Sequence, residues 1–334
     1  MTLMMNSATM TDLPKNDMMG GSFGPELTIY NNFPHTESSC CALLSSGRAA
    51  LDCLLSNMPR PRRVLIPRFI CDTVTEPLQR MELPIVRYQV TEQLEPCPPP
   101  DADSRDLLLL VNYFGLTGEA VHAAALRHPG PVIVDATTAL YTPPLPGIPT
   151  FYSPRKFGGL CDGGVACAPF PLELPTEQDY SAERMLGMWQ RAENGLTAAA
   201  KAIQQAEDSL SAPPRRMSAL TRILLQNIDW QTAARKRLQN YATLHAALAP
   251  INRLQLPPHP AFAPMCYPLV CGIPGLRDEL IDAGVALPLY WPEVIAATSA
   301  DETENRLART LLPLPLDQRY TPTDMQWLIK RILG

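Results

Sequence analysis

The chain has 334 residues, 46% hydrophobic and 18% charged, which is typical of a globular protein long enough for a large and a smaller domain and excludes a disordered chain. A formal net charge of −5 argues against nucleic acid or acidic lipid as a partner, because both attract clustered lysine and arginine. No apolar stretch reaches the ~18–20 residues of a membrane-spanning helix, and the N-terminus lacks the pattern of a secretory signal. We therefore expect a cytoplasmic protein without a membrane partner.

The nine cysteines, at positions 40, 41, 53, 71, 97, 161, 167, 266 and 271, are odd in number, irregularly spaced and mostly surrounded by apolar residues. This pattern indicates reduced, buried thiols rather than a disulfide framework. No two cysteines have the C-x-x-C spacing, and the five histidines are scattered, so we predict no metal site.

Residues 1–44 are expected to form an irregular N-terminal arm, after which helix and strand patterns alternate. A helix is predicted within 45–58, because a serine can cap its start and leucines recur at helical spacing. Strands are predicted at 62–67, 83–88, 106–113 and 131–136, and helices at 72–81 and 119–128. This alternation favours an α/β fold with a parallel sheet covered by helices.

The second half of the chain has a different pattern. Residues 176–247 are mainly helical, with a break at SAPPRRMS (211–218). Prolines become frequent after residue 251, a short strand is expected within 265–273, and helices are expected at 276–284 and 321–333. We therefore predict a large domain over residues 45–250 and a smaller α+β domain over residues 251–334.

Several strand ends carry candidate ligand-binding residues. In an open parallel sheet, ligands bind beyond the carboxyl ends of the strands. These ends carry Arg68 and Phe69, then Asn112 to Phe114, then Asp135 to Thr138, while Lys156 follows the hydrophobic segment at 150–156. The SSGR segment at 45–48 adds a helix start, whose backbone N–H groups can bind an anion.

One cofactor uses all of these groups. Pyridoxal phosphate (PLP) needs a lysine amine to form an imine with its aldehyde, an aspartate to keep its ring nitrogen protonated, a phosphate cradle, and a flat or apolar group over its ring. Lys156 and Asp135 are the candidates for the amine and the carboxylate, and both are predicted to be catalytic. Glycines at 158, 159, 163 and 164 would let the backbone pass close to the cofactor.

The order of these motifs resembles that of the DegT-type sugar aminotransferases, which are PLP enzymes of fold type I. SSGRAAL (45–51) is similar to the family's phosphate-binding SGTxAL, and IVDATTAL (133–140) is similar to its DxAQA element. FYSPRKFGGLCDGG (151–164) is similar to the SFxPxK…GDGG segment, and LLPLPLDQRYT (311–321) to the C-terminal signature. The resemblance covers nearly the whole chain after residue 40.

This resemblance implies a fold type I PLP transferase, with a mainly parallel sheet sandwiched by helices and a smaller C-terminal α+β domain. It implies transfer of an amino group from a small-molecule donor to a keto sugar, which can be nucleotide-linked, by a homodimer with shared active sites. The roles it implies are the phosphate cradle for Ser46, Gly47, Arg48 and Ser153, the pyridine nitrogen for Asp135, the ring hydroxyl for Thr138 and the Schiff base for Lys156.

Some positions differ from the family pattern. Thr138 replaces a glutamine, Ser153 lies two positions later than the usual serine, and Cys71 aligns with a stacking aromatic residue. Pro214 replaces the asparagine that contacts the partner subunit's phosphate. Phe69 and Tyr113 are therefore candidates for stacking on the ring, and Arg215 and Arg216 for binding the phosphate. A PLP enzyme of another reaction type, or a PLP-fold binding protein without catalysis, remains an alternative.

A serine hydrolase is a remote alternative. GGSFG (20–24) fits the Gly-x-Ser-x-Gly motif, with Ser22 as nucleophile and Asp135 and either His245 or His259 following in the order of that fold. The motif requires a strand before the serine and a helix after it, whereas LPKNDMM (13–19) precedes Ser22 and Pro25 follows it.

Overall fold

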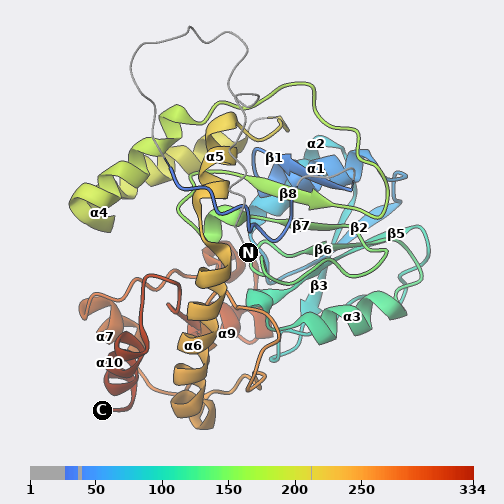
Figure 1. Cartoon of the computed structure of the whole chain (residues 1–334). Coiled ribbons are helices and arrows are strands. Elements are labelled where there is room, and N and C mark those ends of the chain that lie inside the picture. The colour runs from blue at the N-terminus through green and yellow to red at the C-terminus, as the bar shows by residue number, and fades with distance from the viewer. Residues whose placement is uncertain (1–26, 37–39, 212) are drawn as a thin grey trace, which may run out of the picture.

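The computed structural model describes residues 27–36, 40–211 and 213–334. Its centre is an eight-stranded sheet with the order β1-β8-β7-β6-β5-β2-β3-β4 (Figure 1). The strands are β1 (Cys41–Leu44), β2 (Arg63–Pro67), β3 (Ile85–Val90), β4 (Pro96–Cys97), β5 (Asp106–Val111), β6 (Val132–Asp135), β7 (Thr150–Tyr152) and β8 (Gly164–Cys167).

The middle of this sheet is parallel. β2 pairs in parallel with β3 and β5, and β6 pairs in parallel with β5 and β7. The pairs β1–β8, β7–β8 and β3–β4 are antiparallel. Every residue of β5 (DLLLLV) is buried, as expected for a strand covered on both faces. The prediction of a mainly parallel sheet is confirmed.

Helices flank the sheet. In Figure 1, α1 (Gly47–Ser56) and α2 (Thr75–Arg80) lie above it, and α3 (Gly118–Arg127) lies below it. The remaining helices are α4 (Leu186–Asp208), α5 (Ala219–Asn227), α6 (Trp230–Leu248), α7 (Leu276–Asp282), α8 (Pro292–Ala297), α9 (Thr303–Thr310) and α10 (Pro322–Leu333). The predicted α/β fold with a sheet between helices is therefore present.

A second, smaller core lies at the end of the chain. It contains buried residues of α6, α7 and α10 together with the two-stranded antiparallel sheet of β9 (Tyr267–Leu269) and β10 (Leu312–Leu314). The helix α6 runs from the region of the large sheet down to α10 (Figure 1). The two cores are thus joined by one continuous helix.

Five strands were not predicted, namely β1, β4, β7, β8 and β10, and two of them, β1 and β8, pair with each other. The last four residues of the expected irregular arm form β1, and the glycine-rich segment after Lys156 continues into β8. Both are only four residues long, and both lie among glycine, serine or cysteine residues that carry a weak strand pattern. Their pairing with each other, rather than their own composition, makes them strands.

The prediction that all thiols are reduced and buried is wrong. Cys41 and Cys167 form a disulfide, with their Cα atoms 4.1 Å apart. The antiparallel register of β1 and β8 places these residues directly opposite each other, although 126 residues separate them in the sequence. Cys40 and Cys97 are exposed. Spacing in the sequence cannot reveal such a pairing, because it depends on the register of two distant strands.

Over the part of the chain that the structure describes, no helix has both the length and the apolar character to cross a membrane. In the same residues, no group of three or more His, Cys, Asp or Glu side chains is arranged to hold a metal ion.

Candidate active site

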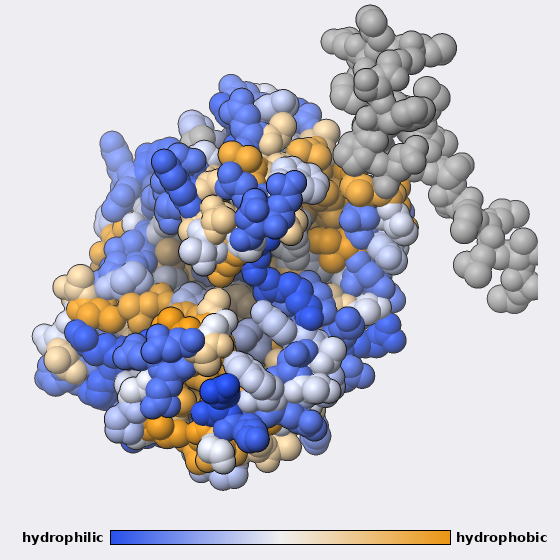
Figure 2. Space-filling view, turned by 90° about the vertical axis from the view of Figure 1, so that its left-hand side faces the viewer, coloured by the Kyte–Doolittle hydropathy of each residue, from blue (hydrophilic) through white to orange (hydrophobic). Residues whose placement is uncertain are grey.

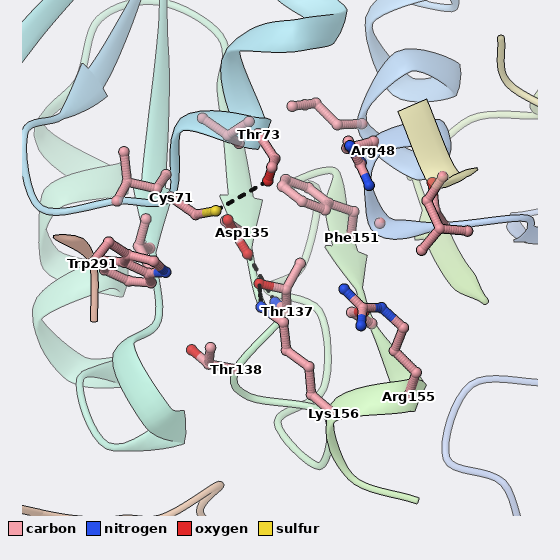
Figure 3. Close-up of a pocket in the computed structure, with 18 of the residues that line it drawn as sticks. Arg48, Cys71, Thr73, Asp135, Thr137, Thr138, Phe151, Arg155, Lys156 and Trp291 are labelled. Carbon is pink, nitrogen blue, oxygen red and sulfur yellow. Dashed lines mark hydrogen bonds between the residues drawn. The ribbon is translucent and has the colours of Figure 1, made fainter. Parts of the chain in front are cut away.

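A cavity of about 200 Å³ lies beyond the carboxyl ends of β2, β5 and β6 (Figure 3). Its wall combines strand ends, the start of α1, the turn that carries Lys156, and the segment before α8. The structure brings together eight of the residues predicted from the sequence, and these are Ser46, Gly47, Arg48, Cys71, Asp135, Thr138, Ser153 and Lys156.

Lys156 and Asp135 are linked through one residue. The Lys156 Nζ atom donates a hydrogen bond to Thr137 Oγ1 (3.2 Å), and the Thr137 backbone N–H donates to Asp135 Oδ1 (2.8 Å). Asp135 is the last residue of β6, and Lys156 ends the short 3₁₀ helix η4 (Pro154–Lys156) that follows β7. Because β6 and β7 are parallel neighbours, both residues reach the same end of the sheet. In Figure 3, Thr137 lies between them.

Burial shifts the pKa of each group in the direction that favours its neutral form. Burial raises the pKa of Asp135, and the nearby Lys156 opposes this shift. Burial lowers the pKa of Lys156, and the Asp135 carboxylate opposes it. The Lys156 side chain is enclosed by protein and yet reached by solvent, because it stands in the open cavity. A lysine of this kind is a better nucleophile at neutral pH than one on the surface.

The start of α1 forms another part of the wall. Ser46 caps the helix, since its hydroxyl accepts a hydrogen bond from the backbone N–H of Ala49 (3.1 Å). A Cβ atom at Gly164 would lie 2.0 Å from the Ser46 carbonyl oxygen, so only glycine allows β8 to pass so close to this helix start. A Cβ atom at Gly47 would contact Thr137 and Ser153 (3.4 and 3.7 Å). The first turn of α1 therefore faces the cavity without a side chain at Gly47.

Ser153 has a polar group suited to a ligand. The residue is only 3% exposed, yet it lines the cavity next to Gly47. Within the described residues, no partner is present for its hydroxyl. This hydroxyl is not among the fully buried polar atoms without a partner, so a polar ligand in the cavity could bond to it.

Two arginines lie at the same side of the cavity, opposite Cys71 and Trp291 (Figure 3). Arg48, on the first turn of α1, contacts Glu76 (2.8 Å) and Glu207 (3.5 Å). Arg155, which directly precedes Lys156, contacts Glu207 (2.6 Å). The predicted cradle residue Arg48 is thus held by two carboxylates.

Thr138 and Cys71 line the cavity, but their side chains also make protein contacts. The Thr138 hydroxyl donates to the Asn112 carbonyl (3.0 Å) and accepts from the backbone N–H of Phe114 (3.1 Å), a residue in the left-handed region (φ 58°). It therefore supports the loop after β5. The Cys71 sulfur lies 3.1 Å from Thr73 Oγ1, and burial raises the pKa of its thiol.

Phe69 and Tyr113, the predicted stacking candidates, do not line the cavity. The Tyr113 hydroxyl donates to the Phe69 carbonyl (2.6 Å), and both rings are buried in the large core. The Phe69 ring packs edge-on against Trp291, with centroids 5.1 Å apart. Among the residues described, the aromatic side chains that line the cavity are Phe151, Tyr290 and Trp291.

Arg215 and Arg216 do not line the cavity of their own chain either. Arg215 forms an ion pair with Glu177 (3.0 Å), and Arg216 donates to the Thr176 carbonyl (3.0 Å). Their backbone is held between the end of β1 and residues 177–179 by hydrogen bonds from Ser45 and to Glu177.

The residues of the hydrolase alternative are not brought together. Ser22 lies outside the described residues. His245 stacks on Tyr241 in the smaller core, and neither it nor His259 lines the cavity that contains Asp135.

The loop after Lys156 is held by residues from far along the chain. Both Arg237 (α6) and Gln318 donate hydrogen bonds to the Phe157 carbonyl (3.2 and 2.8 Å). Arg237 is 2% exposed and also donates to the Met265 carbonyl (2.9 Å). The position of the Lys156 turn thus depends on contacts with the smaller core.

Among the wall residues that the sequence patterns did not single out are Thr137, Arg155, Glu207 and Trp291. Thr137 and Arg155 adjoin predicted residues, so their positions alone could have indicated them. Glu207 and Trp291 lie in segments without a motif, and only the tertiary structure places them at the cavity.

No protein-family profile and no curated protein sequence matches the chain. Solved structures do match. The sugar aminotransferase CalS13 from Micromonospora echinospora is 18% identical, with a TM-score of 0.62 over 87% of this chain and 86% of that one. A DegT DnrJ EryC1 StrS aminotransferase from Brucella abortus is 15% identical, with a TM-score of 0.60 over 88% and 85%.

A third match is the GDP-4-keto-6-deoxy-D-mannose-3-dehydratase of E. coli, solved with bound hydrated PLP. It is 14% identical, with a TM-score of 0.58 over 90% of this chain and 88% of that one. Similarity at these identities concerns the arrangement of elements, and it extends over nearly the whole chain. The chain therefore shares its fold with sugar aminotransferases of the DegT type, as the sequence motifs predict.

Proposed function

We propose that this protein is a PLP-dependent enzyme that transfers an amino group from a small-molecule donor to a keto sugar, with a nucleotide-linked sugar as the acceptor. The observation that carries this proposal is the pair Lys156 and Asp135, linked through Thr137 in one cavity. The similar structures support it, because they include a sugar aminotransferase and a dehydratase of a GDP-linked keto sugar with bound PLP.

The residues present fit PLP at both ends of the cavity. Asp135 is a buried carboxylate that can pair with a protonated ring nitrogen, and Lys156 is an amine with a lowered pKa. At the other side, the first turn of α1 and the unpaired hydroxyl of Ser153 are suited to a phosphate group. Gly47 leaves room there that a side chain would fill.

The cofactor, when bound, supplies an aldehyde that reacts with amines and a ring that withdraws electrons. Lys156 provides the amine at Nζ, and Thr137 accepts a hydrogen bond from it. Asp135 would keep a proton on the ring nitrogen, an interaction worth ~1.5–3 kcal/mol when charged. Trp291, Tyr290 and Phe151 give the cavity wall apolar surface against which a planar ring could pack.

We also propose a homodimer with shared active sites. Large apolar side chains of α4 are exposed, namely Leu186, Trp189, Leu196 and Ile203. Figure 2 shows hydrophobic residues, in orange, on the face that lies to the left in Figure 1. Exposed patches of this kind are typical of interaction surfaces. Arg215 and Arg216, which do not reach their own cavity, are proposed to bind the phosphate at the partner's site.

The domain boundaries remain predictions of the same kind. The separate smaller core, formed by residues from Tyr241 onwards, supports a second domain near the end of the chain, and the boundaries proposed from the sequence are 45–250 for the large domain and 251–334 for the small one.

The test of the cofactor assignment is covalent labelling. The purified protein, incubated with PLP, should turn yellow, and borohydride reduction should attach the cofactor to the peptide that contains Lys156. Lys156→Ala should abolish the adduct, while the control Lys201→Ala, at an exposed position of α4, should keep it. A label on a different lysine would overturn the assignment.

The reaction type is tested separately with the yellow protein. Addition of L-glutamate should convert the bound cofactor to its pyridoxamine form, which absorbs at shorter wavelength. If PLP binds at Lys156 but no amino donor changes the spectrum, the protein is a PLP-fold binding protein or a PLP enzyme of another reaction type. A colourless protein that reacts with a fluorophosphonate probe would instead indicate the hydrolase.

A further inference from the structure

Arg155 and Glu207 form a charged contact at the cavity that the sequence motifs do not explain. Glu207 is the penultimate residue of α4, and its carboxylate lies between two guanidinium groups. It contacts Arg155 at 2.6 Å and Arg48 at 3.5 Å. All three side chains line the cavity, and their exposed fractions are 12% for Arg48, 25% for Arg155 and 34% for Glu207.

The Glu207 carboxylate lies in a part of the cavity that is suited to bind an anion. Arg155 follows Ser153 by two residues, and Arg48 follows Gly47 on the first turn of α1. The two arginines therefore extend the wall that already contains the unpaired Ser153 hydroxyl and the helix start. An anion in this part of the cavity would meet hydrogen-bond donors from two segments of the chain, the start of α1 and the turn at 153–155.

The two arginines are held differently. Arg48 donates two hydrogen bonds to Glu76 (2.8 and 2.9 Å), so it keeps a carboxylate partner when Glu207 is removed. For Arg155, Glu207 is the only carboxylate contact in the described part of the chain. Arg155 can therefore leave Glu207 for another anion without breaking an ion pair with a second carboxylate.

We propose that Arg155 binds the phosphate group of the cofactor, and that Glu207 is the exchangeable partner that holds its guanidinium until the phosphate arrives. The identity of the ligand rests on the proposed function. A phosphate ester carries about −1.5 to −2 charges at neutral pH, and a guanidinium binds it with two parallel hydrogen bonds. A single carboxylate carries less charge, so the phosphate is the stronger partner.

Two consequences follow from the exchange. Removing the Arg155 charge weakens phosphate binding. Removing the Glu207 charge strengthens it, because the phosphate no longer competes with a carboxylate for Arg155. If the Arg155–Glu207 contact were only a surface ion pair, neither change would alter affinity for phosphate.

The experiment measures binding in the full-length Lys156→Ala protein, where no covalent bond contributes. Dissociation constants for PLP and for pyridoxal, which lacks the phosphate, are obtained by equilibrium dialysis. Arg155→Gln should weaken PLP binding about tenfold or more, the effect of one charge-assisted hydrogen bond, and change pyridoxal binding less than about twofold. Glu207→Gln should strengthen PLP binding about three- to tenfold, again without effect on pyridoxal.

Controls separate this effect from general changes. Arg191→Gln, at an exposed position of α4, should leave both dissociation constants unchanged. The double variant Arg155→Gln/Glu207→Gln should bind PLP like Arg155→Gln alone, since Glu207 acts through Arg155. Thermal unfolding of each variant checks that its fold is retained. If Arg155→Gln does not fold, Arg155→Lys takes its place, because lysine keeps the charge but loses the paired hydrogen bonds.

Equal PLP affinity in the parent and Arg155→Gln proteins would overturn the proposal, as would weaker binding in Glu207→Gln. Because pyridoxal and PLP are measured side by side, failure of this inference can be told apart from failure of the proposed function. If PLP binds but its affinity does not depend on Arg155, only this inference is contradicted. If neither PLP nor pyridoxal binds, the proposed function is contradicted as well.

Discussion

At the residue scale, the candidate site depends on two consecutive contacts rather than on single residues. Thr137 connects Lys156 to Asp135, and it does so with its hydroxyl on one side and its backbone N–H on the other. The two charged groups thereby stay near each other in a site whose burial disfavours both charges. PLP chemistry requires a neutral amine and a charged carboxylate, and the lowered pKa of Lys156 favours the first while the nearby Lys156 charge favours the second.

Asp135→Ala tests this coupling. The Asp135 carboxylate raises the pKa of Lys156, whereas burial lowers it. Without the carboxylate, the pKa of Lys156 falls further, so the amine becomes neutral at a lower pH. The rate of PLP attachment, followed by absorbance across pH, should therefore reach its midpoint at a lower pH in the variant. The conversion by L-glutamate should fall by roughly ten- to a hundredfold, because the ring nitrogen loses its charged partner.

The matched control is Asp101→Ala, which removes a largely exposed carboxylate that pairs with Arg63. It should leave both the pH midpoint and the conversion unchanged. An unchanged midpoint in Asp135→Ala, or conversion at the parent rate, would contradict the role of Asp135.

At the element scale, a buried polar network holds the glycine-rich segment between Lys156 and β8. Asp162 is 1% exposed and accepts hydrogen bonds from Ser181, Thr221 and Arg184. Thr221 lies in α5 and Arg184 lies just before α4, so the network joins the loop to both helices. Phe157 and Leu160 of this loop pack into the large core, its glycines add no side chains, and the buried charged hydrogen bonds of Asp162 help to fix the rest of it.

Thr221→Val keeps the shape of the side chain but removes its hydroxyl. Asp162 would then lose a buried donor, and the free energy of unfolding should fall by about 1–3 kcal/mol. Urea unfolding measures this change. The control Thr310→Val removes an exposed hydroxyl that bonds within its own helix, and it should change stability by less than about 0.5 kcal/mol. Equal stability of the Thr221→Val and parent proteins would show that the network does not stabilise the fold.

At the scale of the whole molecule, the site is built from distant parts of the chain. The sheet supplies Asp135, the η4 turn supplies Lys156, and the segment before α8 supplies Trp291. Arg237 and Gln318 then connect the loop after Lys156 to the smaller core. In the proposed dimer a second copy of the chain completes the site, since Arg215 and Arg216 do not line the cavity of their own chain.

A mixed dimer tests the shared site. One subunit carries Lys156→Ala, and the other carries Arg215→Ala with Arg216→Ala. If the arginines act across the interface, one of the two sites in each mixed dimer keeps both its lysine and its arginines. This dimer should regain PLP affinity that the double-arginine homodimer has lost by about ten- to a hundredfold. Sedimentation of the protein as a monomer, or an unchanged affinity in the double-arginine protein, would contradict the shared site.

The sequence by itself determined the local parts of this protein. The cap and leucine spacing of residues 45–58 predict α1, because capping and helical periodicity are properties of neighbouring residues. The buried strand patterns predict β2, β3, β5 and β6, and strands that alternate with helices predict a parallel sheet. Asp135 and Lys156 could be expected at one edge for the same reason, since each directly follows a strand pattern.

Only the tertiary structure decided which of these parts meet. Phe69 and Tyr113 follow strands as Asp135 does, but their rings turn into the core, because side-chain direction depends on packing. The Cys41–Cys167 disulfide and the approach of Glu207 to Arg155 join residues that are far apart in the sequence. Such contacts depend on strand register and on where helices cross, and these are set by the packing of the whole chain rather than by any local pattern.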